Sequence, residues 1–266
     1  MMRSGVDPAG GWDAHRLTLA FGIAAGLPAC AAIAERGGAF SILLAMGLAV
    51  IWEAVFARIR RRPMAWDGLV SALIFALLVP AQTPFWQQGL ALSFGLVMGD
   101  LIFGGRGRGF LSPACVGLAF LLFSFPQAGA EDLGLMTMIA ALGGGAILLG
   151  LGLLSWRVVL GFCLPLLAGA ALSGAPEAVA WMPNATLALG LIFLIGDPVA
   201  AASTNPGRWA YGGMAGALVM LFGSEGSALA SVVFAGLLAS LFAPLMDQAV
   251  VWWAWRRRRN RRGQHG

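Results

Sequence analysis

The chain reads Leu191-Ile-Phe-Leu-Ile-Gly-Asp197-Pro198-Val-Ala-Ala-Ala-Ser203-Thr204-Asn205-Pro206-Gly207-Arg208-Trp209 near its C-terminus. This stretch places a carboxylate, two prolines and several small polar groups between two apolar runs. Backbone amides cannot stay unpaired in hydrocarbon, so an irregular segment at membrane depth must be buried in protein or line a polar cavity. The break is therefore a candidate functional site.

The rest of the chain is strongly apolar. Of its 266 residues, 59% are hydrophobic and only 11% are charged. Many runs reach about 18 to 20 apolar residues, enough to cross roughly 30 Å of hydrocarbon. The composition predicts an all-α, polytopic membrane protein that forms one domain over residues 1–266. We expect about ten spans, at residues 16–34, 39–57, 68–80, 86–103, 110–125, 133–155, 157–173, 184–196, 209–223 and 227–254.

The arginines predict the orientation. With the N-terminus inside, every arginine-rich loop falls on one face of the membrane, which is the positive-inside pattern. These loops carry Arg58, Arg60, Arg61, Arg62, Arg106, Arg108, Arg157, Arg208 and the tail from Arg256 to Arg262. The opposite loops carry Glu35, Glu131, Asp132, Glu177 and Glu225, with Arg36 as their only basic residue. We therefore expect a bacterial inner-membrane protein with residues 1–15 and 256–266 in the cytoplasm, and no nucleic-acid partner.

Other residue patterns carry little chemistry. Residues 1–16 mix acidic residues with Gly and Pro, so no cleavable signal peptide is expected. The isolated cysteines suggest neither a disulfide nor a metal cluster, and both histidines lie in terminal segments. We expect no metal site and identify no catalytic residue. The cysteines are Cys30, Cys115 and Cys163.

Two stretches echo each other. Residues 72–84 and 190–206 both read as a short apolar helix that ends in a proline-rich polar break. Five spans separate them, so the breaks should face opposite sides of the membrane. This favours a 5+5 inverted repeat with broken helices, in which a transport path forms at the repeat interface. Chance similarity between two helices rich in Leu and Ala is the alternative.

Carboxylates within the apolar sequence are the next signal. A charge at the membrane centre costs roughly 2.5 to 3.5 kcal/mol on insertion scales, so it needs a partner or a use. Asp197 adjoins the break, whereas Asp100 could simply pair with a loop arginine, and Asp197 could pair with Arg208. The set comprises Glu53, Asp67, Asp100, Asp197 and Asp247, of which Glu53 and Asp67 could meet the arginines at 58–62.

The break also resembles a known family. The run from Asp197-Pro198-Val199 through Thr204-Asn205 to Gly212 is similar to the D-P-V-[ST]-A-x-x-T-N-x-G-R-x-x-[FY]-G signature of the NqrB/RnfD family. These are flavin-carrying membrane subunits of ion-translocating NADH:quinone and ferredoxin:NAD oxidoreductases. Further stretches fit in the same order: Gly104 to Ala114, Phe120 to Pro126, Pro80 to Gly99, Ser155 to Arg157 and Leu241 to Asp247.

The resemblance implies ten spans, an inverted repeat, cytoplasmic termini and electron transfer between flavins while Na⁺ or H⁺ crosses. In the family one FMN is bound covalently to an S-x-A-T motif between spans 5 and 6. Here that place holds only residues 127–133 and no such motif, so covalent FMN is not expected. Ser112 and Gly109 replace asparagines near a flavin site, and Asp100 replaces a usually basic residue. Noncovalent FMN or riboflavin remains the implied cofactor.

The candidate residues follow from the break and the resemblance. For flavin binding they are Ser112, Pro113, Thr204, Asn205 and Arg208. For the path of an ion or substrate they are Asp197, Ser203, Thr204, Asn205, Asp100 and Asp247.

Three functions remain open. The first is a membrane subunit of an ion-translocating electron-transport complex, with other membrane subunits as partners. The second is a stand-alone transporter or channel for a small solute or ion without redox chemistry. The third is a noncatalytic scaffold for partner subunits.

Overall fold

The computed structural model describes residues 14–61, 64, 66–105, 109, 111–126, 133–173, 184–223 and 227–262. Within these residues every regular element is helical. In chain order the elements are α1 (Ala14–Arg36), α2 (Ala39–Arg60), α3 (Asp67–Leu78), α4 (Phe85–Leu96), the π-helix η1 (Val97–Leu101), α5 (Pro113–Ser124), α6 (Leu135–Gly150), α7 (Trp156–Ser173), α8 (Ala185–Leu189), the π-helix η3 (Gly190–Ile195), α9 (Asn205–Gly223) and α10 (Ala228–Arg262). The all-α prediction is confirmed for the described part of the chain.

Some residues of the sequence prediction lie outside the described residues. They are residues 1–13, the loop arginines Arg62, Arg106 and Arg108, and the acidic residues Glu131, Asp132, Glu177 and Glu225.

Three helices are long and apolar enough to cross a membrane, over Arg16–Arg36, Ala39–Arg60 and Ala228–Trp253. Five shorter apolar helices accompany them: Asp67–Leu78, Pro113–Ser124, Leu135–Gly150, Trp156–Leu172 and Ala185–Ile195. These helices fit a multi-pass membrane protein, whereas the count of ten spans stays a prediction.

The surface of the bundle is apolar. On α2, the side chains of Phe40, Leu43, Ile51 and Ile59 are 58–71% exposed. Such a surface would be unfavourable in water, but hydrocarbon tails of lipid cover it without cost. The exposed apolar side chains therefore agree with a membrane location.

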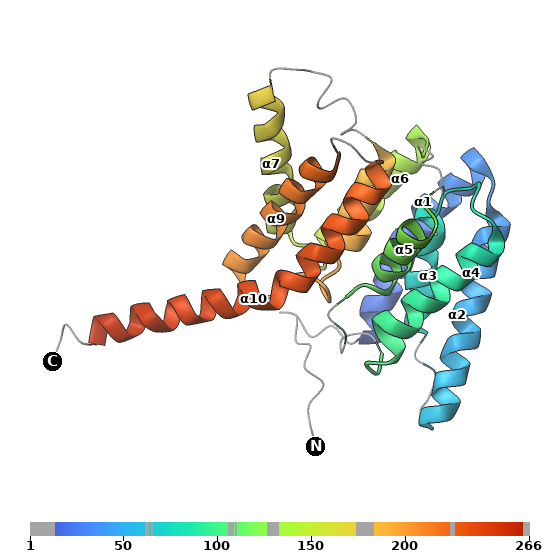
Figure 1. The fold of residues 1–266 in the computed structure, drawn as a ribbon, viewed down its shortest axis with the longest axis horizontal. Coiled ribbons are helices and arrows are strands. Elements are labelled where there is room, and N and C mark those ends of the chain that lie inside the picture. Colours follow the sequence, from blue (N-terminus) through green and yellow to red (C-terminus); the bar gives the residue numbers. More distant parts are fainter. Residues whose placement is uncertain are drawn as a thin grey trace.

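Close helix packing rests on glycines. Figure 1 shows the helices as one bundle, in which α6 packs on α1 and α9 packs between α7 and α10. A Cβ added to Gly144 of α6 would collide with the carbonyl oxygen of Ala24 in α1, and one on Gly216 of α9 would collide with that of Phe162 in α7. Small residues allow this backbone approach, the usual means of joining helices in lipid.

Two short helices end two or three residues before a proline. α3 has 12 residues and spans about 18 Å, and α8 with η3 has 5 and 6 residues and spans at most about 17 Å. Neither crosses the roughly 30 Å of hydrocarbon. Asp197, just after η3, shares a cavity with Asp67 at the start of α3, whereas Pro80 follows the far end of α3. The two breaks thus lie at opposite ends of α3.

Candidate functional site

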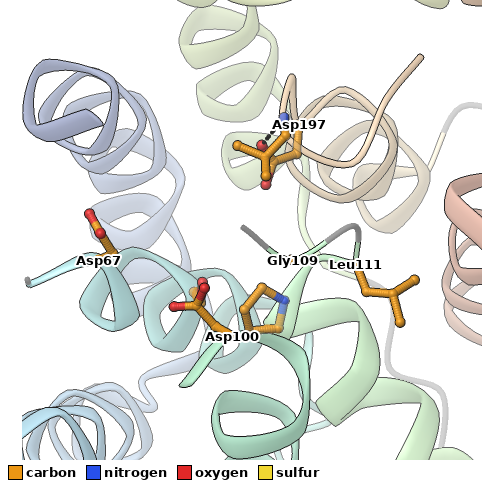
Figure 2. A pocket seen from close by; sticks show the side chains of 8 residues that line it. Asp67, Asp100, Gly109, Leu111 and Asp197 are labelled. Atoms are coloured by element: carbon orange, nitrogen blue, oxygen red, sulfur yellow. Dashed lines mark hydrogen bonds between the residues drawn. The ribbon is translucent and has the colours of Figure 1, made fainter. Parts of the chain in front are cut away.

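Three aspartates surround one small cavity. Asp67 begins α3, Asp100 lies in η1 and Asp197 follows η3, and they are 9%, 7% and 6% exposed. The cavity encloses about 10 Å³, roughly the room for one water molecule. Its other lining residues are Ser71, Gly109, Leu111, Pro113 and Val199. Figure 2 shows the three aspartates on separate elements, with the Asp67 carboxylate directed away from those of Asp100 and Asp197.

Two π-helical segments lie next to the cavity. η1 carries Asp100, and η3 ends two residues before Asp197. A π-helix inserts an extra residue into a turn and changes the direction of the side chains that follow, and such segments are frequent at functional sites. The two π-helices therefore help to orient two of the three carboxylates toward the same space.

Glycines bring the start of α5 against this cavity. A Cβ on Gly95 would lie 2.5 Å from the carbonyl oxygen of Pro113, and one on Gly99 would lie 2.8 Å from the Cα of Pro113. Any side chain at these two positions would push α5 away. Pro113, the first residue of α5, is thereby held in the wall of the cavity.

Fixed donors position two of the carboxylates. Thr18 Oγ1 of α1 donates to Asp67 Oδ1 at 2.5 Å, and the Val199 amide donates to Asp197 Oδ1 at 3.0 Å. Carboxylates that share a space of low dielectric repel one another when ionised, so a cation or a proton there lowers the energy. Among the described residues no three acidic, His or Cys side chains lie close enough to form a closed metal site.

Asp247, a predicted residue of the ion path, forms four hydrogen bonds just before α9. Its two oxygens accept from the amides of Ser203 and Thr204 at 2.7 and 3.0 Å and from their hydroxyls at 2.9 and 2.5 Å. These residues directly precede α9, which begins at Asn205. A carboxylate at a helix N-terminus pairs with free amides and with the positive end of the helix dipole. Asp247 therefore caps α9 from α10.

Glu53 and Glu35 are also helix caps. Glu53 of α2 accepts from the amides of Trp66 and Gly68 at 2.6 and 2.5 Å, at the start of α3. Glu35 of α1 accepts from the amides of Met136 and Thr137 at 2.7 and 3.2 Å, at the start of α6. The sequence offered the arginines at 58–62 as partners for Glu53. The structure gives it backbone amides instead, because the chain turns back within reach of α2 where α3 begins.

The predicted residues thus fall into two places. Asp100, Asp197 and Pro113 line the cavity, whereas Ser203 and Thr204 bind Asp247. Three predicted residues take other positions: Asn205 is exposed at the start of α9, Ser112 is buried before α5, and Arg208 donates its Nε–H to the Ala202 carbonyl at 3.3 Å. In the described part of the chain Arg208 makes this bond and not a pair with Asp197.

Of the predicted flavin residues, Pro113 alone is among the described residues that line the aspartate cavity. The cavity beside Pro113 has room for about one water molecule, far less than a three-ring isoalloxazine needs. The hydroxyl of Thr204 is already bonded to Asp247. The described residues at this place do not fit a flavin, and we derive no chemical step through one.

Sequence reasoning missed two polar residues of the site. Asp67 and Ser71 lie one helical turn apart on α3 and both line the cavity. The spacing i, i+4 put them on one face, which was the available signal. Asp67 was instead interpreted as an interfacial residue beside the arginines at 58–62, because only the fold brings α3 next to η1 and η3.

A second, larger cavity lies at the other end of α3. It encloses about 270 Å³ and is lined by Arg36, Phe40, Ser41, Val79, Phe85 and six small or apolar residues. Arg36 donates to the carbonyls of Ala76, Leu77 and Val79 at 3.2, 2.8 and 3.4 Å. A guanidinium therefore covers the C-terminus of this broken helix.

Comparison with known proteins identifies relatives over most of the chain. It is 35% identical to a Na(+)-translocating NADH-quinone reductase subunit of Pseudomonas paraeruginosa (strain DSM 24068 / PA7), over 75% of this chain and 63% of the relative. The protein of the same name from Yersinia pestis is 31% identical over 94% of this chain and 71% of the relative. The chain thus spans about 63% of the length of the first relatives it matches.

The family model matches this chain in two stretches. The sequence model of the NQR2, RnfD, RnfE family matches residues 13–131 and 128–252, and the division falls between α5 and α6. The match to the Yersinia pestis protein extends over 310 aligned positions, more than the 266 residues of this chain, so that relative carries insertions. With both matched stretches together covering nearly all described helices, the chain belongs to the NQR2, RnfD, RnfE family.

Proposed function

We propose that this chain is a membrane subunit of an ion-translocating electron-transport complex that couples electron transfer to movement of Na⁺ or H⁺. The observation that carries the proposal is the cavity lined by the three buried residues Asp67, Asp100 and Asp197, near the end of a broken helix. The relatives, which are named as subunits of a Na(+)-translocating NADH-quinone reductase, support the same interpretation. Electron donors, acceptors and other membrane subunits would come from the complex.

The cavity suits a single small cation or a proton. Its carboxylates line a space of about 10 Å³, roughly the room for one water molecule. A cation that enters is attracted by the carboxylates, yet it meets no closed set of ligands among the described residues. Binding that is favourable but incomplete allows the ion to leave again, as conduction requires.

Helix pairings support a 5+5 inverted repeat. The pairs α4–α5, α2–α4 and α1–α3 correspond to α9–α10, α7–α9 and α6–α8, and α1–α6 and α5–α10 pair across the proposed axis. The pair α2–α3 has no equally extensive counterpart among the described residues. In such a repeat the substrate path lies at the interface between the repeats, and the cavity is lined both by Asp67 of α3 and by Asp197 beyond η3.

The orientation is part of the proposal. Ten spans with both termini in the bacterial cytoplasm would place the aspartate cavity toward the inner face. Reporter fusions at Arg61, Gly107 and Gly263 should then show cytoplasmic activity, and fusions at Glu131, Glu177 and Glu225 external activity. An external signal from the fusion at Gly107 would contradict both the ten spans and the inverted repeat.

The central experiment measures ion movement. Inside-out membrane vesicles from the native host, with its chromosomal copy replaced by Asp197→Asn or Asp100→Asn, should lose NADH-driven uptake of ²²Na⁺ or H⁺ by at least about tenfold. Asp247→Asn is the matched control, because it neutralises a carboxylate that caps a helix outside the cavity. The proposal fails if Asp197→Asn vesicles, with normal amounts of protein, pump as fast as the parent.

A stand-alone transporter or channel is the second candidate. The observation in its favour is the stretch between α5 and α6, where residues 127–133 contain no S-x-A-T motif for covalent flavin. The optical spectrum of the purified protein separates the candidates. A reversible flavin absorption, held noncovalently as FMN or riboflavin, supports the electron-transport subunit, whereas a colourless protein that moves ions in liposomes supports the transporter.

A further inference from the structure

α10 is longer than a membrane crossing needs. Its 35 residues extend about 52 Å at 1.5 Å per residue, whereas about 20 residues cross the hydrocarbon. Pro244 lies inside the helix, where it removes a backbone hydrogen bond and introduces a bend. Figure 1 shows α10 changing direction midway, with its C-terminal part extending away from the bundle.

Near this bend, Asp247 fixes the helix to the bundle by capping α9. Beyond it the side chains are uncovered: Val251, Trp252, Trp253 and Trp255 are 50–61% exposed. We call residues 248–262 the distal segment. Its first half is apolar and aromatic, and its second half holds the six arginines Arg256, Arg257, Arg258, Arg259, Arg261 and Arg262.

We propose that the distal segment lies along the membrane surface and binds the headgroups of anionic phospholipids. Tryptophan is enriched at the level of the headgroups because its ring is apolar and its N–H is polar. The Cζ atom of Arg256 lies 5.1 Å from the ring centroid of Trp252, so basic and aromatic groups are already side by side. Clusters of four to eight basic residues directly after a membrane helix attract anionic lipid surfaces.

Two other arrangements use the same residues. The apolar window Ala228–Trp253 is long enough to cross the membrane straight, in which case the arginines would project into water. The arginines could alternatively bind an acidic partner protein. The bend at Pro244 and the cap at Asp247 favour the surface arrangement, because they turn the helix before its tryptophans and fix it to the bundle at the turn.

A depth profile tests the arrangement. The full-length protein, with Cys30, Cys115 and Cys163 replaced by Ala, receives one spin-labelled cysteine at Gln248, Val251, Trp255 or Arg258. It is then placed in lipid nanodiscs of phosphatidylcholine with phosphatidylglycerol. Accessibility to oxygen and to a water-soluble nickel chelate should place all four labels at headgroup depth. A steady change from hydrocarbon at Gln248 to bulk water at Arg258 would overturn the proposal.

A second experiment tests whether the distal segment binds anionic lipid. The variant Arg256→Gln, Arg257→Gln, Arg258→Gln should release the segment, with at least a threefold rise in nickel accessibility at Trp255. Removing phosphatidylglycerol should have the same effect. The matched control, Arg58→Gln, Arg60→Gln, Arg61→Gln, removes equal charge at the end of α2 and should leave the profile unchanged. Equal depth in discs of phosphatidylcholine alone, or ordering only after a partner protein is added, would refute binding to anionic lipid.

Discussion

The two broken helices of this chain end in opposite electrostatic surroundings. At the C-terminus of α3, the guanidinium of Arg36 donates to three backbone carbonyls. At the C-terminus of η3, the hydroxyl of Tyr211 donates to the Ile195 carbonyl at 3.1 Å, and the carboxylate of Asp197 follows. A helix C-terminus carries a partial negative charge. A fixed cation neutralises that charge at one end, and a carboxylate adds to it at the other.

The difference teaches which end can attract a mobile cation. Where Arg36 is present, the position that a cation would occupy is already filled by a charge tethered to α1. Where Asp197 is present, Asp67 and Asp100 line the same cavity. The proposed ion site therefore belongs to the η3 end, and the α3 end is a structural counterpart.

Replacing Arg36 should have the largest effect on stability. Arg36→Gln leaves three carbonyls without their charged donor, and we expect a loss of about 3 kcal/mol, since bonds to charged groups contribute about 1.5 to 3 kcal/mol each and this one is partly exposed. Thermal unfolding of the purified protein in mild detergent measures it. Arg58→Gln, on an exposed face of α2, is the control. An unchanged melting temperature would mean that α3 needs no neutralising cation.

Asp247→Asn should come second. An amide keeps one accepting oxygen, so α9 loses about half of its cap, worth about 1 to 2 kcal/mol. Ion transport per folded molecule should stay close to that of the parent. If this variant unfolds no earlier than the parent but stops transport, Asp247 is part of the ion path and not only a helix cap.

Glu53→Gln should have a smaller effect of about 1 kcal/mol. The glutamine oxygen can still accept one of the two amide bonds at the start of α3, while the charge that favours the helix N-terminus is lost. The same unfolding measurement applies. A cost as large as that of Arg36→Gln would show that the two ends of α3 depend equally on charge.

Asp197→Asn should have the smallest effect on stability, although it should abolish transport. The amide oxygen can keep the bond from the Val199 amide, and removing a buried charge relieves desolvation. Unfolding and vesicle transport measured on the same preparation check this. A large loss of stability would instead make Asp197 a structural residue like Asp247.

The structural class of the protein could be predicted from the sequence because it depends on local properties of the chain. Hydrophobic runs, prolines and the distribution of arginine predicted helices close to those observed, including the short elements at 67–78 and 185–195. The π-helices η1 and η3 were not predicted. A π-turn and an α-turn use the same residues, and the choice between them depends on how neighbouring helices pack.

The carboxylates show the limit most clearly. Sequence alone marked five of them within apolar segments, Glu53, Asp67, Asp100, Asp197 and Asp247, and offered arginines as partners for several. The sequence could not show which carboxylates cap helices and which line a cavity. The structure gives Glu53 and Asp247 the amides of helix N-termini, and it gathers Asp67, Asp100 and Asp197 around one cavity.

The sequence by itself determined that this is a helical membrane protein, which family it belongs to and where its helices are broken. Each of these follows from composition and from the need of backbone groups in lipid to find partners within the chain. The tertiary structure alone decided which carboxylates are caps and which face a shared space. That choice depends on distances between α3, η1, η3, α9 and α10, which are set by glycine-mediated packing between residues far apart in the sequence.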